Sequence, residues 1–132
     1  MGVDLSAHNG GIRYTSVSAL GVANLSATRD AGSTAVTDIR GGAITAKATD
    51  PDAAINVTAQ AGTVVLGAVT ASTGGVHLDS QGGSLSTGAV TASWDVRAQS
   101  QDNLVMGATT SRNADVLLDA MTGSVTVTSA SA

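Results

Sequence analysis

The chain contains a six-residue sequence that recurs at a fixed distance, and this repeat limits the folds that the chain can adopt. Gly-Ala-Val-Thr-Ala-Ser starts at Gly67 and starts again at Gly88, 21 positions later. An altered copy, Gly-Ala-Thr-Thr-Ser, starts at Gly107, 19 positions after the second. Self-similarity at a period of roughly 20 to 50 residues is typical of architectures built from stacked repeats.

Apolar residues follow the same period through the whole chain. Their first set, whose members recur every 19 to 21 positions, is Leu5, Leu25, Ile44, Val64, Leu85, Leu104 and Val125. Two positions after each member lies a second set: Ala7, Ala27, Ala46, Leu66, Thr87, Met106 and Val127. The residue between them varies, and such alternation predicts a strand with one buried face. We therefore expect the first set to stack along one axis, with Thr87 needing a partner for its hydroxyl.

A second strand is predicted in each repeat. It is marked by Val17, Val36, Ile55, Val76, Val96 and Val116. Asp38 falls on an inward position of this strand, so we expect a bulge that turns Ile39 inward instead. Ile12, Val69 and Val90 indicate a third short strand. Corners are expected where glycine supplies a positive φ, at Gly41-Gly42, Ala61-Gly62, Gly82-Gly83 and Thr122-Gly123.

The composition favours a stacked fold over a globular core. The chain has no Phe, one Trp and one Tyr, so the aromatic side chains that usually dominate a core are missing. Helices are disfavoured because Val, Thr, Ser and Gly are middling to poor helix formers. A β-sandwich also has short strands, but sandwiches seldom keep one residue type in register over six copies.

Together these features predict one all-β domain over residues 1–132. We expect a right-handed parallel β-helix (solenoid) of about six rungs of 19–21 residues, starting near the first apolar set, because parallel crossovers are normally right-handed. Six rungs would make a rod on the order of 30 Å long. No amphipathic capping helix is recognisable at either end, so we expect a shaft fragment that self-associates end to end through its terminal rungs.

Charge and cysteine content disfavour several partners. The net charge is −4 and no Lys/Arg cluster occurs, so we expect no nucleic-acid partner. No apolar run approaches the ~18 residues of a membrane span, so we expect no membrane insertion. The absence of cysteine excludes disulfides, cysteine–zinc sites and thiol nucleophiles, and is compatible with export in an unfolded state.

The repeats resemble those of a known family. Residues 82–92 (Gly-Gly-Ser-Leu-Ser-Thr-Gly-Ala-Val-Thr-Ala) and 62–71 (Gly-Thr-Val-Val-Leu-Gly-Ala-Val-Thr-Ala) resemble the central repeats of filamentous haemagglutinin-type exoproteins. These are large bacterial adhesins exported by two-partner secretion. The resemblance extends from about Leu5 to Val127 and implies a right-handed parallel β-helix within a secreted, cell-surface fibre used in adhesion and virulence.

The candidate ligand-binding residues are Trp94, His77 and Arg97. His77 and Asp79 share the outward face of one strand, with Arg97 expected on the next rung. Two ligands are too few for zinc and Arg97 disfavours a cation, so we expect no metal and no cofactor. The alternative is a polar outer face whose charges alternate across strands. Trp94 either stacks on a sugar or packs against the rung wall.

Other polar groups are interpreted as non-catalytic. Asp4, Ser6 and His8 form an outward row on one strand, and Asp50-Pro51-Asp52 is predicted to be a surface turn. The basic residues are not expected to converge on one column: Arg13, Arg29, Arg40, Lys47, Arg97 and Arg112. We therefore expect no enzymatic activity.

Three functions follow, in order of preference. The first is a structural shaft segment of a large secreted bacterial adhesin, which extends a rigid fibre from the cell surface for attachment. The second is a surface-binding module whose outer face recognises a host glycan or protein. The third is a polysaccharide-active β-helix enzyme.

Overall fold

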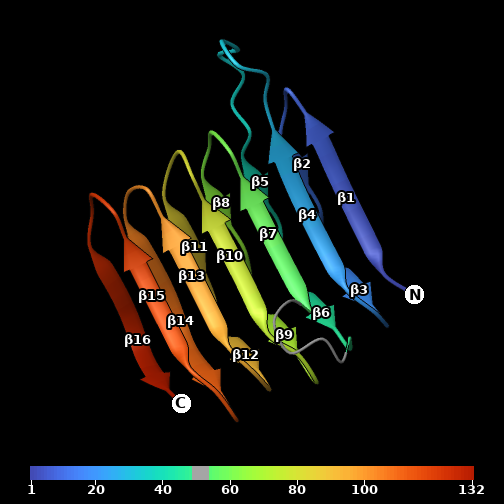
Figure 1. The fold of residues 1–132 in the computed structure, drawn as a ribbon, viewed down its shortest axis with the longest axis vertical. Coiled ribbons are helices and arrows are strands. Elements are labelled where there is room, and N and C mark those ends of the chain that lie inside the picture. The colour runs from blue at the N-terminus through green and yellow to red at the C-terminus, as the bar shows by residue number, and fades with distance from the viewer. Residues whose placement is uncertain (49–53) are drawn as a thin grey trace.

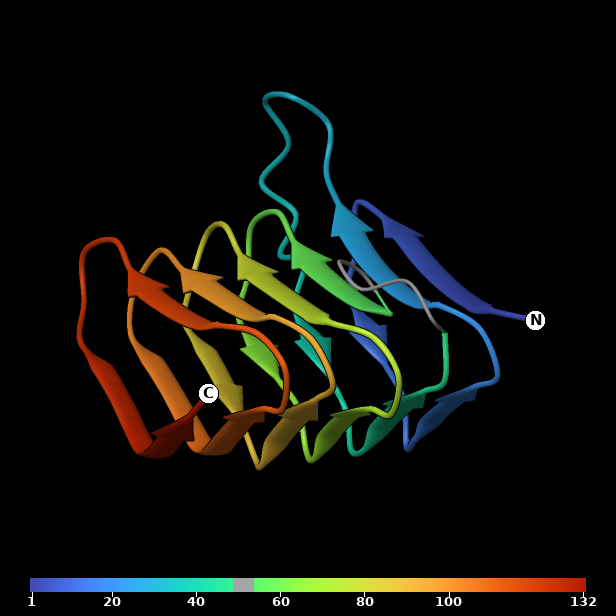
Figure 2. The ribbon, with the colours of Figure 1, turned by 60° about the horizontal axis from the view of Figure 1, so that its bottom comes forward.

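The chain is a parallel β-solenoid. The structure, a computed structural model, describes residues 1–48 and 54–132, and within these residues it contains sixteen strands and no helix. Successive strands wind into a coil of about six turns in which every strand pairing is parallel (Figures 1 and 2). The predicted all-β solenoid is therefore confirmed. No helix long and apolar enough to cross a membrane is found in the described part of the chain.

Three faces form the wall of the coil, and each contains one strand segment from every turn. Face A consists of β1 (Val3–His8), β4 (Ala23–Thr28), β7 (Ile55–Ala59), β10 (Val76–Ser80), β13 (Val96–Ser100) and β15 (Val116–Ala120). Face B consists of β2 (Ile12–Arg13), β5 (Ile39–Arg40), β8 (Val64–Val65), β11 (Leu85–Thr87) and the first halves of β14 (Leu104–Ser111) and β16 (Val125–Ser131). Face C consists of β3 (Val17–Ala19), β6 (Ile44–Ala46), β9 (Val69–Ala71), β12 (Val90–Ala92) and the second halves of β14 and β16.

The predicted first apolar column is correct only in the C-terminal half of the chain. There, Val64, Leu85, Leu104 and Val125 stack in register on face B. Leu5 stacks on Leu25, but this pair lies on face A. Ile44 lies on face C between Val17 and Val69. One predicted column is thus divided among three faces.

The register changes because the second turn is longer than the others. Leu25 pairs with Val57, which is a step of 32 positions, whereas Val57 pairs with Leu78 after 21 positions. Most of the excess lies in the loop of residues 29–38, which joins β4 to β5 and stands out from the coil in Figure 2. Apolar alternation continues on both sides of the loop, so matching at a constant period joins residues from different faces.

The other strand predictions divide in the same way. Ile55, Val76, Val96 and Val116 stack on face A as expected. Val17 instead lies on face C, and Val36 lies in the 29–38 loop with 64% of its surface exposed. Ile39 is fully buried, but it begins β5 and is not part of a bulge. The predicted third short strand is confirmed at Val69 and Val90, which pair in register on face C, whereas Ile12 lies on face B.

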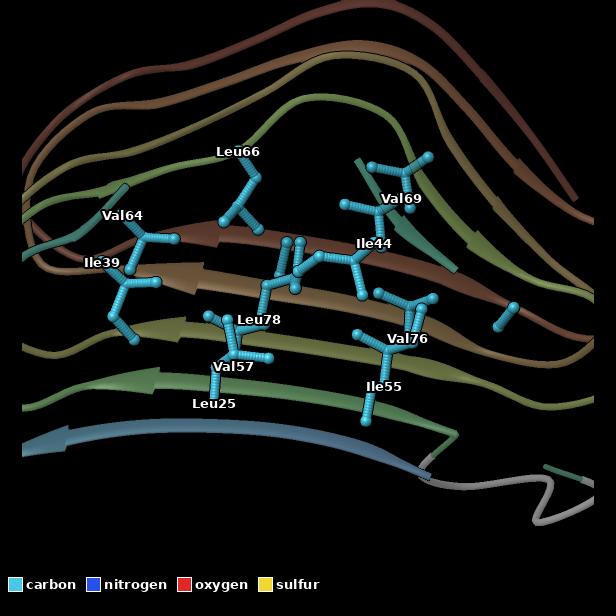
Figure 3. Close-up of a cluster of buried hydrophobic side chains, with 14 of the residues drawn as sticks. Leu25, Ile39, Ile44, Ile55, Val57, Val64, Leu66, Val69, Val76 and Leu78 are labelled. Atoms are coloured by element: carbon cyan, nitrogen blue, oxygen red, sulfur yellow. The ribbon is translucent and has the colours of Figure 1, made fainter. Parts of the chain in front are cut away.

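Inward side chains from the three faces meet in one aliphatic core. Figure 3 shows Val64 and Leu66 directed from one wall toward Val57 and Leu78 on the opposite wall. Burying a Leu or Val side chain stabilises a fold by roughly 1.5–3 kcal/mol, so the core compensates for the missing aromatics through repetition. Thr87 is buried in this core, and its Oγ1 donates to the carbonyl of Gly88 at 3.0 Å.

Glycine is required at one corner because the turns lie very close together there. An added Cβ at Gly67 would lie 2.9 Å from the carbonyl carbon of Gly42 on the preceding turn. The equivalent distances are 3.2 Å from Gly88 to Gly67 and 2.9 Å from Gly107 to Gly88. Among the described glycines only Gly32 has a positive φ, of 81°, so the expected positive φ at the corners is wrong. The close approach of the backbones explains why the repeated six-residue sequence starts with glycine.

The two terminal turns leave part of the core uncovered. Val3, Leu5 and Ala7 of β1 are half-buried, whereas Leu25 of the next turn is fully buried. At the other end β15 has the same half-buried pattern, and Val125 of β16 is exposed. On face A the inner residues of the terminal strands are therefore less buried than those that have a turn on both sides, whereas Ile12 and Val17 of the first turn, on faces B and C, are buried.

Gly67→Ala should lower the free energy of unfolding by about 1–3 kcal/mol, because the methyl group overlaps the backbone of Gly42. Urea unfolding followed by circular dichroism measures this change. Gly10→Ala is the matched control, since nothing lies within 4 Å of a Cβ at Gly10. Equal midpoints for the two variants would contradict the close-packed corner.

Candidate functional site

Face A carries polar side chains outward at in-register positions of neighbouring strands. His77 on β10 lies beside Arg97 on β13, and Asn56 on β7 lies beside His77 on the other side. Asp79 follows two positions after His77 and points to the same side of the face. Leu78 between them is buried in the core. The structure thus brings together His77 and Arg97, two of the three candidate residues.

A shallow hollow of about 290 Å³ lies over these strands. Its lining includes His77, Asp79, Arg97, Gln99, Leu117 and Asp119. Leu117 is 59% exposed and provides an apolar edge beside Arg97, with which it is in register. The hollow therefore presents donors, acceptors and one apolar contact, which are the groups that bind a hydroxylated or amide-bearing ligand.

One ion pair and one side-chain hydrogen bond engage the charged groups of this hollow. Arg97 Nη2 lies 3.4 Å from Asp95 Oδ2, and Gln81 Nε2 donates to Asp79 Oδ2 at 3.1 Å. Asp95 Oδ1 also accepts the backbone N–H of Asp115 at 3.0 Å. This ion pair joins residues two positions apart along the chain, and no opposite charges are in register across β10, β13 and β15, so the expected alternation of charge across strands is not seen there.

Trp94 lies outside the hollow formed around His77 and Arg97. It precedes β13, it is 43% exposed, and its carbonyl accepts the Ser111 hydroxyl at 2.8 Å. Its backbone N–H donates to the carbonyl of Gly74 on the preceding turn. The corner is therefore fixed, and the side chain is partly available to solvent.

The remaining sequence candidates form no shared site. Asp4, Ser6 and His8 are exposed in a row along β1, as predicted. The segment Asp50-Pro51-Asp52 lies outside the described residues. Within residues 1–48 and 54–132 no three His, Cys, Asp or Glu side chains are grouped so that they could hold a metal ion.

The structure brings two of the six basic residues into one column, although the sequence predicted no convergence. Arg13 on β2 and Arg40 on β5 are in-register neighbours and both point outward from face B. The sequence places them in different columns because they lie 27 positions apart, well outside the repeat period. The 29–38 loop supplies the additional residues, so only the three-dimensional fold reveals the pair.

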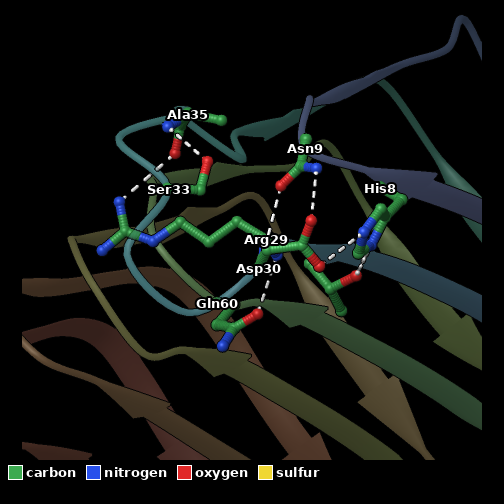
Figure 4. A network of polar contacts seen from close by, with 8 residues as sticks. His8, Asn9, Arg29, Asp30, Ser33, Ala35 and Gln60 are labelled. Carbon is green, nitrogen blue, oxygen red and sulfur yellow. Dashed lines mark hydrogen bonds and ion pairs between the residues drawn. The ribbon is translucent and has the colours of Figure 1, made fainter.

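The structure also contains a polar network that sequence reasoning missed. His8 Nε2 lies 2.9 Å from Asp30 Oδ1, and His8 Nδ1 lies 3.3 Å from Thr28 Oγ1 (Figure 4). Asn9 pairs reciprocally with Asp30: its Nδ2 donates to Asp30 Oδ2 at 3.0 Å, and its Oδ1 accepts the Asp30 backbone N–H at 2.9 Å. The only available signal was that Thr28 follows His8 by one repeat, 20 positions along the chain.

This network fixes the start of the 29–38 loop to the turns on either side. The backbone N–H of Arg29 donates to Gln60 Oε1 at 2.8 Å, and its side chain donates to the carbonyl of Ala35 at 3.3 Å. Asn9 adopts a φ of 56°, a left-handed conformation that Asn tolerates better than most residues. The loop is thus bonded to the first turn through Asn9 and to the third through Gln60.

The hydrogen bond from Asn9 and the charge of His8 hold the pKa of Asp30 below its usual value. A carboxyl group whose pKa is lowered by folding contributes stability above its unfolded pKa, and that contribution is lost as the pH falls through the folded pKa. The network should therefore loosen only on the acidic side of the ordinary Asp range. Because Asp30 is fully solvated, the effect on global stability is small.

No family model, curated protein or solved structure matches this chain significantly.

Asn9→Gly should raise the titration midpoint of the Asp30 carboxyl toward the ordinary Asp value. The variant removes the amide that donates to Asp30, while glycine accepts the positive φ at this position. Carbon-13 NMR of the carboxyl signal against pH measures the midpoint. Gln60→Ala is the control, because it removes the acceptor for Arg29 and leaves the Asn9–Asp30 pair intact. An unchanged midpoint in Asn9→Gly would refute the assignment.

Proposed function

We propose that this chain is a structural shaft segment of a large secreted bacterial adhesin or exoprotein, extending a rigid fibre from the cell surface for attachment. The observation that supports this proposal is the uninterrupted axial stack, in which every turn pairs in parallel with the next around one aliphatic core. The bacterial and secreted part of the proposal depends on the resemblance of residues 62–71 and 82–92 to filamentous haemagglutinin-type repeats.

The stack favours a mechanical role because bending it costs free energy at every contact between neighbouring turns. Bending a solenoid stretches backbone hydrogen bonds on its convex side and opens contacts between neighbouring turns. Stability in such folds approximates a sum of turn and nearest-neighbour terms, so adding turns extends the rod without a new core. The function of a shaft is to hold a distal binding tip at a distance, and this requires length and stiffness in place of a pocket.

The ends of this chain are suited to head-to-tail association with a second copy. Continuing the columns places Val116 against Val3 and Leu118 against Leu5 of the next copy on face A. On face B, Val125 would meet Ile12. These apolar residues would complete the half-covered core, and unpaired strand edges would gain hydrogen-bond partners. A heterologous contact without closure produces an open filament.

At high concentration the chain should form rods whose lengths are multiples of about 30 Å, seen by electron microscopy and as a concentration-dependent sedimentation coefficient. Leu5→Lys should keep the chain monomeric, because it places a charge in the end-to-end core. Ser6→Lys is the matched control, since Ser6 points outward on the same strand. Circular dichroism verifies that both variants fold. A monomeric wild type, or equal association of the two variants, would contradict the proposed contact.

The second candidate function is recognition of a host-surface glycan or protein by the outer face. The hollow around His77 and Arg97, together with the partly exposed Trp94, supports it. If the shaft proposal is correct, a glycan-array and host-protein screen with the labelled chain gives no saturable signal. A saturable signal that Arg97→Gln or Trp94→Ala abolishes, but that Arg112→Gln retains, would instead establish the binding module.

A further inference from the structure

Face B places two guanidinium groups side by side. Arg13 and Arg40 are in register on β2 and β5, and the residues before them, Ile12 and Ile39, point into the core. Neighbouring parallel strands are about 4.8 Å apart, so the two side chains leave the wall at adjacent points. Like charges directly opposite each other across strands are destabilising unless a counter-charge compensates them.

Only one carboxylate among the described residues is placed to compensate this pair. Asp38 Oδ2 lies 3.5 Å from Arg40 Nη2, while Asp38 Oδ1 accepts the backbone N–H of Thr63 at 2.7 Å. The Arg13 side chain has neither an ion pair nor a hydrogen bond with any described residue. Two positive charges therefore face one negative charge, and one oxygen of that carboxylate is already bonded to the backbone.

A hollow lies over this pair. The hollow has a volume of about 440 Å³ and is lined by Gly11, Arg13, Val36, Asp38 and Arg40. Gly11 contributes no side chain to the lining of the hollow. A Cβ at Gly11 would lie 2.5 Å from the carbonyl oxygen of Asp38, so a larger residue does not fit at this position. Val36 from the 29–38 loop is 64% exposed and forms an apolar edge.

We propose that Arg13 and Arg40 form an oxyanion-binding site for a phosphoryl or sulfuryl group carried on a small apolar body. A guanidinium group is a planar fork that binds two oxygens of such a group, and two adjacent forks can share one tetrahedral oxyanion. Asp38 holds Arg40 in place and leaves Arg13 free to close on the ligand. Val36 contacts the apolar body. This site is on a different face from the His77–Arg97 hollow and does not depend on the shaft proposal.

The test is an NMR titration of the Arg13 and Arg40 side-chain signals with phenyl phosphate at low ionic strength, where surface charges are least screened. We expect saturable binding with a Kd on the order of 1 mM. Arg13→Gln and Arg40→Gln should each weaken it about tenfold, the expected loss for one charged hydrogen-bonding group. Arg112→Gln carries the same charge change on an exposed residue after β14 and should leave the Kd unchanged.

Three further measurements define the ligand. Inorganic phosphate should bind several-fold more weakly than phenyl phosphate, and Val36→Ser should remove this difference without altering the affinity for inorganic phosphate. Comparing the Kd of sulfate with that of inorganic phosphate shows whether the site prefers a sulfuryl or a phosphoryl group. Acetate should bind at least about tenfold more weakly than either ion, because it offers only two oxygens in one plane. The proposal would be overturned by NMR chemical-shift changes that do not saturate with phenyl phosphate. It would also be overturned if Arg112→Gln weakened the binding as much as Arg13→Gln does, or if acetate bound as tightly as phosphate. Circular dichroism of each variant confirms that the chain remains folded.

Discussion

The structure depends on axial stacking: in turns that have a neighbour on each side, the inward side chains are buried by their equivalents on the turns before and after. Leu25 is buried because Leu5 and Val57 lie on either side of it, and Leu5 itself is only half-buried because this chain supplies a turn on one side alone. Small and branched aliphatic residues suit this arrangement, since each turn fills a narrow interior and the number of turns supplies the total buried area.

Stacking constrains the inside and the tight corners, and leaves the rest of each turn free to vary. An added Cβ at Gly67 or Gly107 would lie 2.9 Å from the backbone of the preceding turn, and one at Gly88 would lie 3.2 Å from it, so the preceding turn crowds all three positions. The loop of residues 29–38, by contrast, inserts extra residues between β4 and β5 without disturbing the parallel register of either strand. Such an insertion lies outside the core, and its backbone is bonded to both neighbouring turns through Asn9 and Gln60.

The outward-facing side chains are the positions at which a binding function can be added without disturbing the stack. Strand register brings side chains from successive turns to adjacent points on the surface, whatever their distance along the chain. His77 and Arg97 meet in this way on face A, and Arg13 and Arg40 meet on face B. In the first pair Arg97 is ion-paired with Asp95, whereas in the second only Arg40 is ion-paired, with Asp38, and Arg13 has no ion pair among the described residues. This difference in charge balance makes face B the stronger candidate for an anionic ligand, and face A remains consistent with a solvated wall.

Three features could be predicted from the sequence because these turns keep a nearly constant period: the class of fold, the stack of Val64, Leu85, Leu104 and Val125, and the adjacency of His77 and Arg97. The sequence could not assign Leu5, Leu25 and Ile44 to their faces. Apolar residues alternate in the same way on every face, and this alternation does not reveal that the 29–38 loop adds residues to one turn. The Arg13–Arg40 pair, the Asn9–Asp30 network and the steric reason for the corner glycines became visible only in the three-dimensional fold. Each depends on which residues of different turns become neighbours, and that is set by the lengths of the loops between them.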